Sequence, residues 1–83
     1  MDERIRDLFA TLLQVPPEQI QDDTSPAVLE RWDSMRHLIV VAGFEEEFGL
    51  DLDPEEAVEM YKDFATFKRI LRRRMEAGDR RHG

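Results

Sequence analysis

Residues 33–50 read DSMRHLIVVAGFEEEFGL and contain the clearest helix of the chain. Asp33 is a strong candidate for its N-cap, because a carboxylate can accept from the backbone N–H groups that a first helical turn leaves unpaired. Gly49 is a typical helix stop, so the pattern predicts a helix from Ser34 to about Phe48. Ser34 then holds the first helical position, where a phosphate ester would lie at the positive end of the helix dipole. The position therefore suits a serine that is modified rather than one that attacks.

The apolar residues of this predicted helix fall on two of its sides. One broad side is assigned to the core, and it consists of Leu38, Val40, Val41, Phe44 and Phe48. The opposite side carries Met35, Ile39 and Ala42, with Glu45 and Glu46 beside them. A small domain cannot cover both sides, so we expect this second side to be exposed as a partner-docking surface. The alternative is that the long loop before Asp33 buries it.

The first part of the chain predicts one helix followed by a long connection. Apolar residues recur at helical spacing and stop before Pro16 and Pro17; they are Ile5, Leu8, Phe9, Leu12 and Leu13. Residues 15–32 then form a connection that needs anchors of its own. We expect these anchors to be Ile20, Val28, Leu29 and Trp32, with a brief helical turn after Ser25 and Pro26.

Two further helices are predicted after residue 50. Asp53, Pro54 and Glu56 are a typical helix start, and they open a short helix through about Met60. A final helix begins near Asp63 or Thr66, ends at Gly78, and has an inner face of Phe64, Phe67, Ile70, Leu71 and Met75. No stretch alternates with a period of two, so no sheet is expected. The prediction is an all-α antiparallel bundle of three main helices and one short helix, with residues 1–77 as the domain and 78–83 as a flexible tail.

The ordered set Asp33-Ser34-Met35, Glu45 to Leu50 and Pro54 to Ala57 resembles the acyl and peptidyl carrier proteins. Met35 stands where that family usually has leucine, a swap that conserves volume. The resemblance implies a carrier-protein fold with phosphopantetheine attached covalently to Ser34. It also implies that a phosphopantetheinyl transferase recognises Asp33, and that acids along the second helix receive basic residues of partner enzymes.

From this resemblance we expect a freestanding carrier that is not itself an enzyme. An acyl- or aminoacyl-loading ligase would charge it, and downstream synthase or transferase enzymes would receive the thioester. Arg36, His37 and Ile39 make the region around Ser34 less acidic than the fatty-acid-type pattern of the family. The Trp32-Asp33-Ser34 junction and His37 resemble stand-alone carriers of specialised pathways, so a polyketide, nonribosomal peptide or aminoacyl pathway is expected. A housekeeping fatty-acid carrier and an unmodified helical adaptor remain the alternatives. We expect a cytoplasmic monomer.

Charge and composition narrow the range of partners. Residues 1–67 contain 17 acids and 5 bases, whereas residues 68–83 contain 2 acids and 7 bases, so −12 and +5 sum to the net charge of −7. The acidic body argues against nucleic acid, and the basic cluster is expected to complement a helix C-terminus. There is no cysteine, and no apolar run indicates a signal peptide or a membrane span.

His37 lies one turn after Ser34, and this spacing is also compatible with a serine–histidine hydrolase. The glycine-flanked serine elbow of such enzymes is absent, and His82 lies in the expected tail. We therefore expect His37 to pack near Trp32 and the long loop, with a place beside the prosthetic arm as the alternative. The acids around Asp53 lack the ligand spacing of a calcium loop, and no metal is expected.

Overall fold

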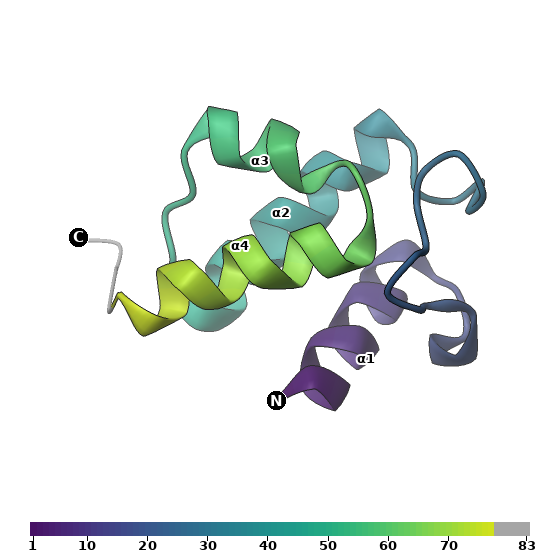
Figure 1. Cartoon of the computed structure of the whole chain (residues 1–83), viewed down its shortest axis with the longest axis horizontal. Coiled ribbons are helices and arrows are strands. Elements are labelled where there is room, and N and C mark those ends of the chain that lie inside the picture. The colour runs from purple at the N-terminus through teal and green to yellow at the C-terminus, as the bar shows by residue number, and fades with distance from the viewer. Residues whose placement is uncertain (78–83) are drawn as a thin grey trace.

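The computed structural model describes residues 1–77, which form four α-helices and one 3-10 turn (Figure 1). The elements are α1 (Asp2–Leu13), η1 (Pro17–Gln19), α2 (Ser34–Phe48), α3 (Pro54–Met60) and α4 (Phe64–Glu76). These residues contain no strand, and the predicted all-α bundle of three main helices and one short helix is confirmed. The predicted stop at Gly78 and the tail 78–83 lie outside the described residues. None of the described helices is long and apolar enough to cross a membrane.

Local capping sets the boundaries of the later helices. Asp53 and Glu56 form the predicted capping box at the start of α3. Of the two candidate starts for α4, Asp63 is the N-cap, because its Oδ1 accepts from the Thr66 backbone N–H at 2.8 Å. Gly49 ends α2 in the left-handed conformation, with φ at 65°, which glycine adopts without the steric cost other residues meet.

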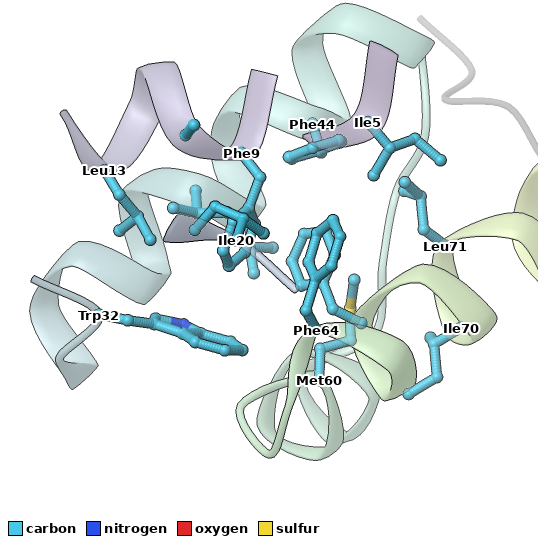
Figure 2. Close-up of a cluster of buried hydrophobic side chains, with 14 of the residues drawn as sticks. Ile5, Phe9, Leu13, Ile20, Trp32, Phe44, Met60, Phe64, Ile70 and Leu71 are labelled. Atoms are coloured by element: carbon cyan, nitrogen blue, oxygen red, sulfur yellow. The ribbon is translucent and has the colours of Figure 1, made fainter. Parts of the chain in front are cut away.

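Aromatic rings from three helices and the loop meet in the core (Figure 2). The Phe9 ring lies 4.9 Å from Trp32, 4.8 Å from Phe64 and 4.9 Å from Phe67, measured between ring centroids. Phe44 of α2 contributes an edge-to-face contact with Phe67 at 5.0 Å. Such geometries are favourable for aromatic pairs. Most of the inner faces predicted for α1 and α4 is confirmed as buried: Ile5, Phe9, Leu13, Phe64, Phe67, Ile70 and Leu71. The other predicted members, Leu8, Leu12 and Met75, are partly buried and pack against this core.

The long loop is held down by buried side chains, as predicted for Ile20, Leu29 and Trp32. The prediction for Val28 is wrong, because this side chain is 75% exposed. The Ser25 carbonyl accepts from the N–H groups of both Val28 and Leu29, at 3.1 and 2.9 Å. This helical turn directs Leu29 inward and leaves its neighbour Val28 in solvent.

Hydrogen bonds also fix the loop to the start of α4, which the sequence reasoning had missed. The Thr24 carbonyl accepts from the Phe64 N–H at 2.9 Å, and the Asp22 carbonyl accepts from the Ala65 N–H at 3.0 Å. Lys68, a buried cation, donates to the Asp22 carboxylate at 2.7 Å. The hydrogen bond and charge of Lys68 hold the pKa of the Asp22 carboxyl below its usual value of 3.8.

The two sides of α2 differ in burial largely as expected. Val40, Val41 and Phe44 are buried, and Phe48 packs half-buried against the core. The prediction that Leu38 lies in the core is wrong, because its side chain is 67% exposed. The reason is that α1 packs along α2 while α3 packs along α4, which leaves the side of α2 that carries Leu38 as one wall of an open groove toward α3.

Candidate functional site

Ser34 is an exposed residue at the first position of α2. The residue before it, Asp33, is the N-cap: its Oδ1 accepts from the Arg36 backbone N–H at 2.8 Å. The predicted capping arrangement is therefore present, and the Ser34 hydroxyl is not the cap. The unpaired N–H groups of this helix end favour an anionic substituent on Ser34.

Arg36 has a second role that the sequence reasoning had missed. Its guanidinium Nη1 lies 2.8 Å from the Asp33 Oδ2, so Asp33 is held through both carboxylate oxygens. The three-residue spacing of opposite charges was the signal that could have found this pair. Both side chains are partly exposed, so the ion pair adds little stability, but it orients the carboxylate next to Ser34.

An apolar groove of about 530 Å³ lies between the start of α2 and α3. Ser34 is among its lining residues, together with Met35, Leu38, Val58 and Tyr61. Leu38 and Val58 are 67% and 76% exposed, so the groove is open to solvent. Apolar walls beside an exposed hydroxyl can shelter an organic chain attached to that hydroxyl.

His37 is a buried residue in the lining of this groove, and it joins two other parts of the chain. The Trp32 indole Nε1–H donates to the His37 Nδ1 at 3.0 Å, and the His37 Nε2 lies 2.7 Å from the Ala57 carbonyl oxygen. Because an indole N–H can only donate, Nδ1 must be the acceptor, and the proton of the neutral ring is on Nε2. Burial lowers the pKa of His37 below its usual value of 6.5, while the hydrogen bond to Ala57 acts in the opposite direction. The predicted packing near Trp32 is confirmed, and the link to α3 is new.

This geometry also bears on the hydrolase alternative. Both ring nitrogens of His37 are engaged, one by Trp32 and one by Ala57. A general base needs a free lone pair within hydrogen-bond reach of the nucleophile. His37 therefore has no nitrogen available to activate the Ser34 hydroxyl in this arrangement.

Comparison with known protein families shows to which family the chain belongs. A model of the family described as "Phosphopantetheine attachment site" matches residues 3–72, which is most of the chain. The chain belongs to this family. Its members are phosphopantetheine carriers that hold the prosthetic group covalently on a serine and are generally not catalytic. Comparisons with curated proteins and with solved structures found no match.

The residues of this carrier domain fit a covalent phosphopantetheine group. The chain has two serines, Ser25 and Ser34. Ser25 is half-buried within the loop turn, whereas Ser34 is exposed at a helix N-terminus beside the apolar groove. The helix end suits the phosphodiester, and the groove suits the organic part of the arm.

The predicted docking surface is exposed on the carrier domain. Met35 and Ile39 are 73% and 54% exposed, and Ala42 lies on the same open side. The alternative prediction, that the long loop buries this side of α2, is therefore wrong. Glu46 is exposed, but the Glu45 carboxylate accepts from the Leu52 N–H at 2.8 Å and ties α2 to the segment before α3. Docking at this surface stays a prediction.

Proposed function

We propose that this protein carries acyl or aminoacyl groups as thioesters on a phosphopantetheine arm attached to Ser34. The observation that carries the proposal is the contrast between its two serines: Ser34 is exposed at the start of α2 beside an apolar groove, and Ser25 is half-buried in the loop. When bound, phosphopantetheine supplies the thiol that holds the acyl group. The low acidity around Ser34, where Arg36 pairs with Asp33, supports partners of a specialised pathway over those of housekeeping fatty-acid synthesis.

The chain's own residues present and shelter the arm. Asp33 fixes the first turn of α2, and the helix N-terminus stabilises the negative charge of the attached phosphate. Leu38, Val58 and Tyr61 offer an apolar surface that keeps water from part of the arm or its cargo. Docking to each enzyme is transient, because one carrier must visit a transferase, a loading ligase and a downstream synthase in turn.

Intact mass and peptide mapping test the proposal. The protein is treated with a broad-specificity phosphopantetheinyl transferase and coenzyme A, and we expect the mass of one phosphopantetheinyl group to be added. Trypsin then separates the two serines, because cleavage after Arg31 and Arg36 leaves Ser34 in residues 32–36 and Ser25 in residues 7–31. The added mass should lie on residues 32–36. No added mass would favour the unmodified helical adaptor, and mass on residues 7–31 would place the arm on Ser25.

Asp33 is expected to assist recognition by the transferase as well as capping. Asp33→Asn keeps a good N-cap but removes the charge, so we expect slower modification with little loss of stability. Asp33→Ala should also cost about 1 kcal/mol of unfolding free energy through the lost cap. Modification rates and urea denaturation measure the two effects separately. Equal modification rates for both variants and the parent would remove Asp33 from recognition.

The exposed side of α2 is expected to contact partner enzymes through Ile39. Ile39→Asp places a charge where an apolar contact is needed, so we expect the transferase's kcat/KM for the carrier to fall about tenfold, typical of losing one interface anchor. The melting temperature should stay near that of the parent, because Ile39 is 54% exposed. Val28→Asp is the matched control: Val28 is also an exposed apolar residue, but it lies in the loop. Equal losses for both variants would show that added charge, not contact at Ile39, causes the effect.

A further inference from the structure

His37 connects the residue that precedes the Asp33-Ser34 pair to the helix on the far side of the groove. Trp32 is fully buried, and its indole packs against Phe9 at 4.9 Å and Tyr61 at 6.0 Å between ring centroids. Its N–H donates to His37, which in turn lies within hydrogen-bond distance of Ala57 in α3. One imidazole therefore links the end of the long loop, the first turn of α2 and the middle of α3.

The protonation state of His37 decides whether this link can exist. A second proton would have to go on Nδ1, where it would face the Trp32 N–H across 3.0 Å. Two donors cannot share a hydrogen bond, so protonation breaks the link to Trp32 and leaves a buried indole N–H without its acceptor. The hydrogen bond to the Ala57 carbonyl persists, because Nε2 carries a proton in both states.

We propose that His37 is a positioning residue whose neutral ring joins Trp32 to Ala57 of α3 through two hydrogen bonds, a link that we call the clasp. We propose further that protonation of His37 releases Trp32 and slows the modification of Ser34. The hydrogen-bonded link between Trp32, His37 and Ala57 concerns the folded chain alone. The second part rests on the proposed function, because Trp32 directly precedes Asp33, the cap that fixes the start of α2. Release of Trp32 loosens the segment that a transferase must engage.

Burial favours the neutral form of the imidazole, whereas the Ala57 carbonyl acts in the opposite direction. From the segment after α3, the titratable phenol of Tyr61 faces the ring, with 4.9 Å between centroids. Phe67 of α4 and Trp32 of the loop lie 6.4 Å and 6.0 Å away and do not titrate, and α3 contributes the Ala57 carbonyl. Burial among these rings lowers the pKa of His37 from its usual value of 6.5.

The protonation of His37 can be distinguished from acid unfolding of the protein by the pH at which each occurs. On α2 itself, Asp33 and Arg36 form an ion pair without net charge. The Asp22 and Asp63 carboxyls have pKa values lowered from 3.8, so their contributions to stability are lost only in stronger acid. Because the pKa of folded His37 is below 6.5, its contribution is complete above pH 6.5 and declines as the pH falls toward the lowered value.

The fluorescence of Trp32, the single tryptophan, tests the clasp directly. We expect the emission of the parent to change in one transition as the pH is lowered from about 8, with a midpoint below 6.5. His37→Asn retains an acceptor for Trp32, and His37→Gln retains a donor for Ala57, but neither side chain titrates. Both variants should lack the transition.

His82 offers the matched control, because it is the second of the two histidines. His82→Gln should show the same transition as the parent. A parent without a transition, a transition that persists in both His37 variants, or its loss in His82→Gln would each overturn the clasp. The titration of the parent protein still tests the clasp even if one variant fails to fold.

Modification kinetics test the positioning role separately. The rate for the parent divided by the rate for His37→Asn is measured at each pH, so that the transferase's own pH dependence cancels. We expect this ratio to fall severalfold across the fluorescence transition. A ratio that does not change with pH overturns the positioning role. If no form is modified at any pH while the Trp32 transition persists, the proposed function fails, and the positioning role fails with it, but the clasp is supported.

Discussion

Ser34→Ala should abolish the mass increase that a phosphopantetheinyl transferase and coenzyme A produce on the parent protein. The variant has no hydroxyl at the start of α2, and hence no oxygen that can form the phosphodiester beside the groove. Its stability should stay within about 0.5 kcal/mol of the parent, because an exposed first-turn residue contributes little packing. Intact mass measures the modification, and thermal denaturation confirms the fold.

Ser25→Ala is the matched control for this result. Ser25 is half-buried, and its carbonyl rather than its side chain holds the turn to Val28 and Leu29. The alanine variant should therefore fold and be modified as the parent is. Modification of Ser34→Ala, or loss of modification in Ser25→Ala alone, would show that the arm is not on Ser34.

Phe44→Ala should have the largest effect on stability. Phe44 is fully buried in α2, and its ring contacts Phe67 at 5.0 Å and Phe48 at 5.8 Å between centroids. Removing a buried phenylalanine side chain costs about 3–5 kcal/mol, through lost burial and the cavity left behind. Domains have only about 5–15 kcal/mol in total, so the variant should unfold at much lower urea concentration. Trp32 fluorescence and circular dichroism report the transition.

Leu38→Ala gives the matched comparison on the same helix. Helical periodicity alone would put Leu38 in the core with Phe44, yet it is 67% exposed beside the groove. Its removal should change the unfolding free energy by about 0.5 kcal/mol or less, as for other surface residues. A loss as large as that of Phe44→Ala would mean that Leu38 is buried in solution and that the groove is closed.

The helices could be read from the sequence because their signals are local. Asp33, Asp53 and Asp63 cap the helices that follow them, and a cap needs only backbone N–H groups two or three residues away. Gly49 ends α2 for an equally local reason. The inner faces of α1 and α4 followed from periodicity, because each helix buries one continuous stripe. The family resemblance, drawn from the same stretches, is confirmed by the match over residues 3–72.

Contacts between helices and loops could not be predicted from local sequence signals. Leu38 is exposed because α3 packs against α4 and leaves that side of α2 open, which no feature of α2 encodes. The pair of Lys68 and Asp22 joins residues 46 positions apart in the chain. The role of His37 required Ala57 to come within hydrogen-bond reach from another helix. Capping and amphipathic periodicity determine where helices form. The groove beside Ser34 and the protonation state of His37 depend instead on how the helices pack, which is a property of the whole core.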